Sequence, residues 1–261
     1  MNTSNKIGVS YNCFSATELL PYSIAQIRKH VNHIVCIIQK ESYQNIPFYE
    51  DNKQVINDLF TNGLIDDIIY YDNTNQTPKQ NECNKRNLGK NALKKAGCTH
   101  FLTMDEDELY KSEQFERATK QIIKSGFDSS ACQMQTYYKS PRFRVVPPES
   151  YFVPFLYKLD DRVFKLGQNY PVLADPSRKL QTTKHYSFNR LELEMFHYSY
   201  IRKDIRRKLF NSASAQNYGK RLTEIANYFD LWTYPNKAYL GGSKKRLMNV
   251  EEVPNHFEIN I

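Results

Sequence analysis

Short apolar runs and helical patterns alternate along the first hundred residues. Each apolar run is seven residues long, and "HIVCIIQ" at 33–39 shows the β-branched composition of a strand covered on both faces. The segments between the runs place apolar residues on one helical face, and Ser15 and Glu18 have capping-box spacing at the start of the first segment. The predicted strands are 6–12, 33–39, 66–72 and 99–105, and the predicted helices are 15–31, 49–63 and 84–97.

This order of elements predicts an α/β fold with a doubly wound, mostly parallel sheet flanked by helices. In such sheets, ligands bind outside the carboxyl ends of the strands. The four predicted strands end near Asn12, Gln39 to Glu41, Asp72 and Asp105. We therefore expect a ligand site at this edge, where polar side chains gather.

The pattern changes after residue 110. A helix is predicted at 112–126, and the segment 128–200 is aromatic, tyrosine-rich and interrupted by prolines, which favours mixed strands and long loops. Two carboxy-terminal helices are expected at about 201–211 and 214–229, before a polar tail. No repeat or clear linker divides the chain, so we expect one domain over 1–261. Its expected parts are 1–110, 111–200 and 201–261.

The basic residues are concentrated in a few segments. The net charge is +8, and the excess lies in 79–95 and 200–209, with a smaller cluster at 243–246. Such an excess indicates an anionic partner, which includes nucleotides, nucleic acids and acidic membrane surfaces. Because screening limits the reach of exposed charge to about 8–10 Å, the position of these segments is more informative than the total.

Cysteine usage and the amino terminus favour the cytoplasm. The five cysteines are odd in number and form no C-x-x-C pair, so we expect reduced, mostly buried thiols. The first ten residues lack a signal-peptide core, and no apolar run approaches the roughly 20 residues that span a bilayer.

An acidic cluster, "DEDE" at 105–108, follows the fourth predicted strand. Alternate residues of an extended segment face the same way, so Asp105 and Asp107 can approach one ligand together. Two such carboxylates suit Mg²⁺ or Mn²⁺ whose coordination is completed by phosphate oxygens. The alternative is a solvated acidic loop that caps the next helix. Nearby Lys85, Arg86 and Lys90 favour the phosphate interpretation, because cations near a helix amino terminus bind phosphate.

These motifs together resemble the GT-A-fold glycosyltransferases, most of all bacterial enzymes of the family 2 kind. The resemblance rests on "KIGVSYN", "HIVCIIQKES", "KRNLGKNALKKAGCTHFLTMDEDELY" and "HYSYIRKDI". It implies a D-x-D motif at 105–107 that binds the metal and the sugar nucleotide, and a late histidine, His197, as a further metal ligand. The family also has a basic residue followed by Asn before the helix, and Arg86 and Asn87 match this pair. Without the resemblance, His197 in its aromatic run would more often be a hydrogen-bonded core residue than a metal ligand, and the resemblance makes the two interpretations about equal.

The resemblance implies a set of site residues. The expected metal ligands are Asp105, Asp107 and His197. The expected substrate-binding residues are Tyr11, Asn12, Gln39, Glu41, Lys85, Arg86, Lys90, Asp105, Glu106, Arg202 and Lys203. The sequence departs from the family after the second strand, where Gln39 and Glu41 replace the usual D-x-x-S, and it lacks a clear E-D pair for the general base. We prefer Asp175 as this base, with Glu194 second and Asp160–Asp161 as a further candidate.

The sequence therefore predicts a metal-dependent glycosyltransferase that moves a sugar from a nucleoside diphosphate to a carbohydrate or lipid-linked acceptor. It would use Mn²⁺ or Mg²⁺, face the cytoplasm and contact an anionic membrane peripherally. One alternative is a sugar nucleotidylyltransferase, although "SYNCFSATE" lacks the glycines of a phosphate loop. A second is a metal-dependent phosphoesterase. A basic nucleic-acid binder is less well supported, because it would leave the acidic cluster unexplained and no motif of that kind is present.

Overall fold

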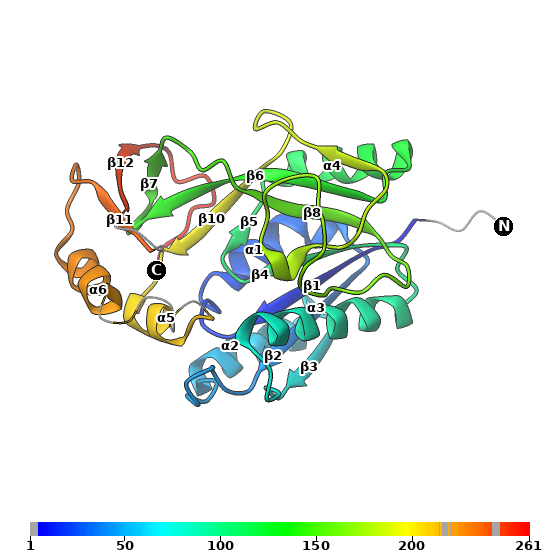
Figure 1. Cartoon of the computed structure of the whole chain (residues 1–261), viewed down its shortest axis with the longest axis horizontal. Helices are drawn as coiled ribbons and strands as arrows, with labels where there is room; N and C mark the ends of the chain where they lie inside the picture. Colours follow the sequence, from blue (N-terminus) through cyan, green and yellow to red (C-terminus); the bar gives the residue numbers. More distant parts are fainter. Residues whose placement is uncertain (1–4, 214, 216–218, 220, 242–245) are drawn as a thin grey trace.

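The computed structural model describes residues 5–213, 215, 219, 221–241 and 246–261. Twelve strands of these residues form one sheet, with the path β11-β12-β7-β6-β8-β4-β1-β2-β3 and with β5, β9 and β10 paired beside it (Figure 1). The strands of the first half are β1 (Ile7–Cys13), β2 (His33–Gln39), β3 (Asp67–Tyr71), β4 (His100–Asp105) and β5 (Glu108–Leu109). The later strands are β6 (Ser129–Tyr138), β7 (Ser140–Val146), β8 (Phe152–Lys158), β9 (His185–Ser187), β10 (Glu194–Tyr200), β11 (Ala238–Leu240) and β12 (Arg246–Glu252). The α-helices are α1 (Leu20–Ile27), α2 (Glu50–Thr61), α3 (Pro78–Lys95), α4 (Ser112–Ser125), α5 (Ile205–Asn211) and α6 (Arg221–Leu231).

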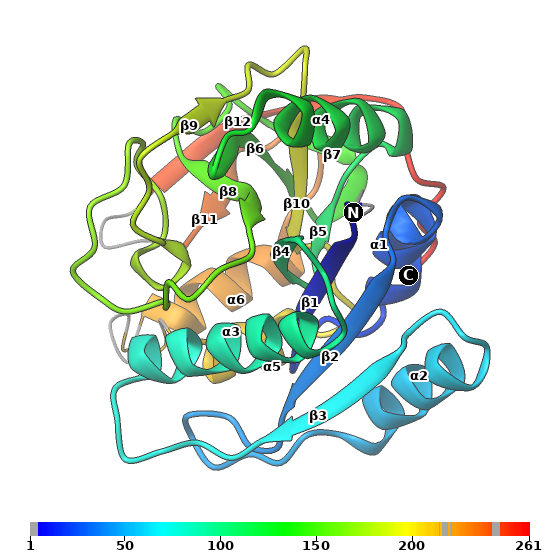
Figure 2. The same ribbon diagram turned by 90° about the vertical axis from the view of Figure 1, so that its right-hand side faces the viewer.

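The strands β3, β2, β1 and β4 form the parallel part of the sheet. Helices cover both faces of β2, and this coverage explains its apolar run. Ile34, Cys36 and Ile38 pack into a core with α1, α2 and α4, whereas Val35 and Ile37 pack on the opposite face with α3. Figure 2 shows α3 on one side of these strands and α1 and α2 on the other. This alternation explains why every residue from 34 to 38 is apolar, as the sequence pattern predicted.

The second half of the sheet is mixed. β8 runs antiparallel to both β4 and β6, and β10 runs parallel to β6 and antiparallel to β5. The helices α5 and α6 pack with β11 and β12 around a separate aromatic cluster that includes Trp232 and Tyr138. The predicted fold class is confirmed: the fold is α/β, with a largely parallel central sheet flanked by helices, a mixed-strand half and carboxy-terminal helices.

Two predicted helix starts were wrong. The first helix begins at Leu20 rather than at residue 15, because the backbone N–H groups of residues 14–16 donate to the Glu106 carboxylate and hold the chain in a loop. The third begins at Pro78 rather than at residue 84. Thr77 and Gln80 form its capping box, and Pro78 occupies the first turn, where its missing N–H costs nothing.

The two carboxy-terminal helices are present and end within two residues of their predicted ends, but both begin later than predicted. α5 begins at Ile205 rather than at about residue 201, and α6 begins at Arg221 rather than at about residue 214. Residues 214, 216–218 and 220 of the predicted 214–229 helix lie outside the described part of the chain, as do residues 243–245 of the third basic cluster. All five cysteines are free and buried, as expected. Within the described residues, every helix is too short or too polar to cross a bilayer.

Candidate functional site

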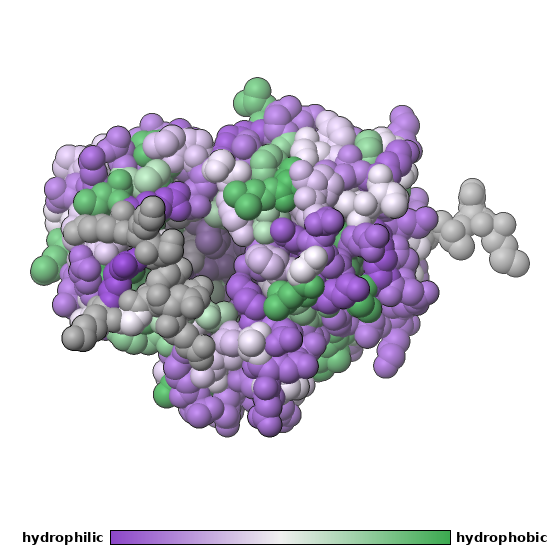
Figure 3. Space-filling view, viewed as in Figure 1, coloured by the Kyte–Doolittle hydropathy of each residue, from purple (hydrophilic) through white to green (hydrophobic). Residues whose placement is uncertain are grey.

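A polar pocket of about 300 Å³ lies where β1, β2 and β4 end, beside α3 and beneath β10 and α5. We call it the central pocket. Figure 3 shows the molecular surface hollowed between the carboxy-terminal part on the left and the remainder of the protein. The register of the parallel strands explains the location, since Asn12 of β1 lies opposite Asp105 of β4. The predicted site residues that line the central pocket are Asn12, Gln39, Lys85, Arg86, Asp105, Glu106, Asp107, His197 and Arg202.

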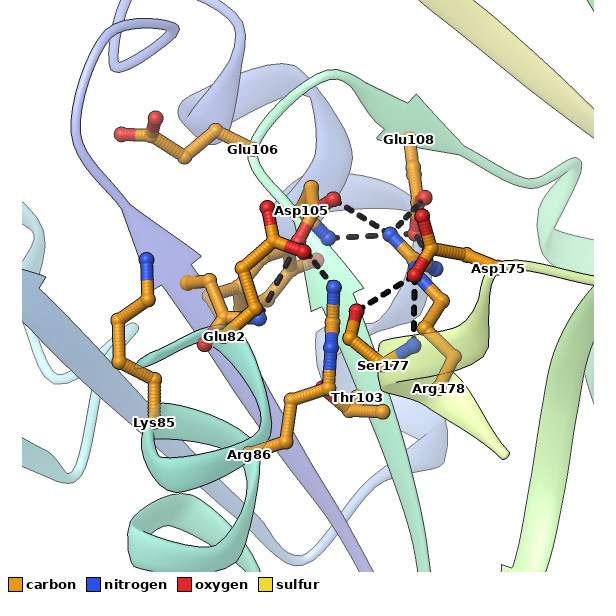
Figure 4. A network of polar contacts seen from close by, with 12 residues as sticks. Glu82, Lys85, Arg86, Thr103, Asp105, Glu106, Glu108, Asp175, Ser177 and Arg178 are labelled. Atoms are coloured by element: carbon orange, nitrogen blue, oxygen red, sulfur yellow. Dashed lines mark hydrogen bonds and ion pairs between the residues drawn. The ribbon is translucent and has the colours of Figure 1, made fainter. Parts of the chain in front are cut away.

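Glu106 fixes the loop that follows β1. Its carboxylate accepts hydrogen bonds from the backbone N–H groups of Phe14, Ser15 and Ala16 at 2.8–3.0 Å, and from the Thr17 hydroxyl at 2.9 Å. The side chain is buried, and Figure 4 shows it turned away from Asp105. Its protein contacts occupy both carboxylate oxygens, so its predicted role in substrate binding would have to act through the loop that it holds.

Asp105 is paired with two arginines. Its Oδ1 accepts from Arg86 Nη2 at 3.3 Å, and its Oδ2 accepts from Arg178 Nη2 at 2.5 Å (Figure 4). Asn12 Nδ2 also donates to Oδ1, at 3.2 Å. Burial alone would raise the pKa of this carboxyl, but Arg178 and Arg86 together hold its pKa well below the usual range. Asp105 is therefore ionised at neutral pH.

Arg178 also pairs with Glu108, which is the fourth acid of the cluster. The Arg178 guanidinium donates to both Glu108 oxygens, with 3.0 Å between Nη1 and Oε2, and both side chains are almost fully buried. Burial raises the pKa of Glu108 to about 7 even so. The two acids differ because Arg178 is the single cation that Glu108 contacts among the described residues, whereas Asp105 also contacts Arg86.

Asp107 also lines the central pocket. Its Oδ2 accepts from Arg202 Nη2 at 2.6 Å and lies 4.0 Å from His197 Nε2. The His197 Nδ1 atom is buried and has no hydrogen-bond partner among the described residues. β10 brings His197 here by pairing it with Glu108 of β5. Burial would raise the pKa of Asp107, but Arg202 lowers it below the usual value.

Two ammonium groups border the central pocket without a carboxylate within ion-pair distance in the described chain. Lys85 Nζ donates to Gln39 Oε1 at 2.6 Å, and Lys208 Nζ lies 4.8 Å from the centre of the Tyr200 ring. Burial lowers the pKa of Lys85. Burial, with a further contribution from Arg202, lowers the pKa of Lys208 to about 8. An anion in the pocket would stabilise the charged form of both lysines, because its negative charge offsets the cost of burying their positive charge.

Besides Asp175, Asp160 and Asp161, which are described below, the predicted residues outside the lining of the central pocket are Tyr11, Glu41, Lys90, Glu194 and Lys203. The Tyr11 hydroxyl is buried against Ser23, and Lys90 donates to the backbone carbonyls of residues 160 and 162. Glu194 pairs with Arg190 at 2.5 Å, and Lys203 is exposed. Glu41 lines a neighbouring polar pocket of about 350 Å³, which we call the edge pocket.

Asp175 borders a third cavity, of about 180 Å³, which we call the inner pocket. It adjoins the central pocket and shares Arg86, Asp105 and His197 with it. The remaining lining is more apolar and includes Met134, Tyr151, Phe152, Val153 and Met195. The structure thus places Asp175 next to the central pocket, on the far side of the Asp105 carboxylate.

The Asp175 carboxylate is already occupied by hydrogen bonds. Its Oδ1 accepts from the Ser177 N–H and hydroxyl at 2.8 and 2.6 Å, and its Oδ2 accepts from Lys79 Nζ at 2.8 Å. Burial would raise its pKa, but Lys79 and the Ser177 contacts lower the pKa to about 2. Lys79 also binds Glu82, which lines both the central and the inner pocket. Of the other candidates, Asp160 pairs with Arg162 and Asp161 with Lys94.

Four of the residues that build the site were absent from the sequence prediction: Glu82, Glu108, Arg178 and Lys208. The sequence contained a signal for two of these four residues. Glu108 belongs to the acidic cluster, and Lys208 belongs to the basic segment 200–209. The contact of Arg178 with Asp105 spans 73 residues, and no local pattern encodes such a contact.

The arrangement of the acids does not fit the predicted metal ion. Each Asp105 oxygen and one Asp107 oxygen already accept from guanidinium groups, which compete with a cation for the same lone pairs. Within the described residues, no three His, Cys, Asp or Glu side chains converge as metal ligands would. The assignment of Mn²⁺ or Mg²⁺ to Asp105, Asp107 and His197 stays a prediction, and no step below depends on it.

The role of Glu106 can be tested by Glu106→Gln. The amide keeps one acceptor oxygen but replaces the other with a donor, so we expect the free energy of unfolding to fall by about 1–2 kcal/mol. Urea denaturation followed by circular dichroism measures this change. Glu116→Gln, on the outer face of α4, is the matched control. Equal stabilities of the two variants would show that Glu106 does not hold the loop.

Comparison with known proteins gives distant structural neighbours only. No protein-family profile and no curated protein matches the sequence. The S. aureus TarS 1–349 structure has a TM-score of 0.48 at 11% identity, over 85% of this chain and 72% of that one. TarS 1–349 in complex with UDP-GlcNAc has a TM-score of 0.38 at 15% identity, over 56% and 37% of the two chains.

A third neighbour is mannose-1-phosphate geranyltransferase from Thermus thermophilus, with a TM-score of 0.34 at 10% identity, over 60% of this chain and 51% of that one. The chain spans 22% of the longer TarS structure and 38% of TarS 1–349 in complex with UDP. Likenesses of this size assign neither an activity nor a ligand, so the functional argument rests on the site.

Proposed function

We propose that the protein is a GT-A glycosyltransferase that moves a sugar from a nucleoside diphosphate to a carbohydrate or lipid-linked acceptor. The observation that carries this proposal is the placement of Lys85 and Lys208 on one pocket at the carboxyl edge of the parallel sheet, each without a carboxylate partner in the described chain. Two ammonium groups on one pocket, of which Lys85 is buried and Lys208 half-buried, suit a diphosphate, whose charge is balanced better by two cations than by one.

The edge pocket supports a nucleoside beside the diphosphate. It adjoins the central pocket at Tyr43, and its other lining residues include Glu41, Ser42, Asn73 and Asn81. Amide, hydroxyl and carboxylate groups of this kind supply both donors and acceptors for a base and a ribose. Its position after β2 and β3 matches the edge where ligands of parallel sheets bind.

The catalytic contribution of the central pocket would be electrostatic. Transfer of the sugar leaves a diphosphate with one more negative charge than it carried in the donor. Lys85, Lys208 and Arg202 surround the pocket in which this charge would develop. Cations that are already in place stabilise the leaving group without reorganisation.

The acceptor is proposed to enter the inner pocket, whose more apolar lining suits the face of a sugar ring or a lipid-linked chain. If the reaction inverts the anomeric centre, a carboxylate there takes the acceptor proton. The sequence favoured Asp175, but a carboxyl with a pKa of about 2 and with both oxygens hydrogen-bonded would be a poor base. Glu82 lines both pockets, and Lys79 donates to its Oε2 only, whereas both Asp175 oxygens accept hydrogen bonds; we therefore propose Glu82 as the proton acceptor.

We therefore expect Glu82→Gln to reduce turnover by roughly 10²–10⁴ at saturating donor, which is the range for general acid–base catalysis. Asp175→Asn should have a smaller effect. Glu194→Gln serves as a control, because Glu194 lines neither pocket. Initial rates of sugar transfer measure the three variants. A large loss for Asp175→Asn, with Glu82→Gln at full turnover, would restore the assignment made from sequence.

The proposed setting is the cytoplasm, at the inner face of the membrane, in the synthesis of a surface polysaccharide or glycolipid. Lys203, which precedes α5, is exposed and supports contact with anionic lipid, whereas the exposed Arg206 in the first turn of α5 is paired with Asp230. The alternative of a sugar nucleotidylyltransferase shares the nucleotide site and differs in its products.

The decisive experiment is a thermal-shift screen against UDP-, GDP- and dTDP-sugars, followed by product analysis. A ligand that binds only the folded state raises its melting temperature by mass action. Release of the nucleoside diphosphate identifies a glycosyltransferase, whereas formation of a nucleotide sugar from a triphosphate identifies the nucleotidylyltransferase. A protein that binds none of these ligands is not a nucleotide-sugar enzyme.

A further inference from the structure

We propose that the diphosphate is bound by Lys85, Arg202 and Lys208 without a metal ion, and that the acids at 105–108 serve to position arginines and the loop after β1. This inference rests on the proposed function, since it names how the same pocket meets the charge of its ligand. It replaces the metal of the sequence prediction with side chains of the chain itself.

The oxygens of Asp105 are the first reason. A metal bound between Asp105 and Asp107 would need at least one open lone pair aimed into the pocket from each. Arg178 and Arg86 each donate to a different Asp105 oxygen (Figure 4), and Asn12 adds a third hydrogen bond. The Arg178 guanidinium is fixed in turn by Glu108, so moving it would leave a buried carboxylate unpaired.

The remaining acids of the cluster are also engaged. Asp107 pairs with Arg202, both side chains being at least 90% buried, and Glu106 accepts four hydrogen bonds from residues 14–17. Glu108 accepts from Arg178 and from the Asp105 N–H. The residues outside the described part of the chain contain no Asp, Glu, His or Cys, so they add no ligand of these types.

The cations are arranged for an anion. Arg202 is held by the Ser15 carbonyl at 2.8 Å and by Asp107, which fixes the guanidinium at the wall of the central pocket. Lys85 belongs to α3 and Lys208 belongs to α5, and both side chains line the central pocket. A diphosphate between them would be bound by cations from two parts of the chain. This is the electrostatic task that a divalent ion otherwise performs.

The test compares UDP, GDP and dTDP binding by isothermal titration calorimetry in EDTA and in about 5-fold molar excess of Mn²⁺ or Mg²⁺ over nucleotide, enough to load a carboxylate site. We expect the diphosphate that binds best to have the same Kd within about twofold in all three conditions. Lys208→Ala should weaken this diphosphate at least about tenfold while changing the affinity of the free nucleoside little, because a charge-assisted contact is lost. Lys120→Ala, a charge-matched change on the outer face of α4, is the control.

The Asp107→Asn variant provides a second test, because the metal-free and the metal-bound interpretations predict opposite changes in diphosphate affinity. If the carboxylate only balances Arg202, its removal leaves the guanidinium free for phosphate, so the diphosphate should bind equally or more tightly. If Asp107 is a metal ligand, binding should fall and its dependence on Mn²⁺ should disappear. The retained circular dichroism spectrum shows that the variant is folded.

The outcomes separate the two proposals. Binding that needs Mn²⁺ or Mg²⁺, or an Asp107→Asn variant that loses the diphosphate, overturns the metal-free inference and leaves the glycosyltransferase proposal intact. Equal losses of nucleoside and diphosphate in Lys208→Ala also overturn it. Failure of every diphosphate to bind in any condition overturns the proposed function and the inference together.

Discussion

Replacement of Arg178 by methionine is expected to lower the free energy of unfolding by about 3–5 kcal/mol, the cost of breaking a buried ion pair by removing one partner. The guanidinium lies between Asp105 and Glu108, and the Arg178 and Glu108 side chains are only 6% and 4% exposed. Without it, Glu108 would be a buried carboxyl group with no ionic partner among the described residues, and it would have to take up a proton or remain as an unpaired charge. Urea denaturation monitored by circular dichroism at pH 7 measures the loss.

The double variant Arg178→Met with Glu108→Met is the control for this prediction. Replacing both partners of a buried pair by apolar residues removes the unpaired charge, so most of the lost stability should return. If the single and the double variant are equally unstable, the loss comes from packing rather than from charge.

The depressed pKa of Asp105 makes the free energy of unfolding depend on pH. Because its folded-state pKa is depressed, the pairing contributes stability above the unfolded pKa of about 3.9, and this contribution is lost as the pH falls through the folded value. The Arg178→Met variant removes the larger cause of the depression. Its stability should therefore decline less on acidification than that of the wild-type protein.

Gly89→Ala is expected to lower the free energy of unfolding by about 3 kcal/mol, at the upper end of the cost of overpacking. Gly89 is the point where α3 touches β1. A Cβ atom at this position would lie 1.8 Å from Ser10 Oγ and 2.6 Å from Ser10 Cβ. The helix would have to move away from the strand, and Lys85 and Arg86 would move with it. Urea denaturation gives the change in stability, and nucleotide affinity reports the displacement of the helix.

Ser10→Gly supplies the matched rescue. The Ser10 hydroxyl is buried and has no hydrogen-bond partner among the described residues, so its removal should cost only about 0.5–1 kcal/mol for the added chain flexibility. Combined with Gly89→Ala, it removes the atoms that clash and should restore most of the stability. A double variant no more stable than Gly89→Ala alone would locate the strain elsewhere.

The buried strands were predictable from sequence because a strand covered on both faces needs an unbroken apolar run. β2 occupies 33–39, the residues predicted for it, and β4 agrees to within one residue at each end. β3 agrees equally well although it is a partly exposed edge strand. The start of α3 was also encoded, since "TPKQ" combines a capping box with an early proline, but the basic residues that follow drew the predicted start to residue 84.

The site was only partly predictable. Strand ends brought Asn12, Gln39 and Asp105 to one pocket, as the rule for parallel sheets anticipates. What the acids contact depends on residues far along the chain: Arg178 lies 73 positions from Asp105, and Arg202 lies 95 positions from Asp107. A local acidic pattern predicts a cation nearby, and it does not distinguish a guanidinium from a metal.

The pairing of β4 with both β1 and β8 limits how this chain can be recombined with others. β8 joins β4 at His100↔Lys158, and β10 reaches back to β5 at His197↔Glu108, so the later half supplies strands to the sheet of the first. A chimera that exchanges everything after residue 110 would have to reproduce both registers and an arginine in place of Arg178. If the inner pocket binds the acceptor as proposed, single substitutions in that pocket are therefore a more direct way to alter acceptor preference than the exchange of whole segments.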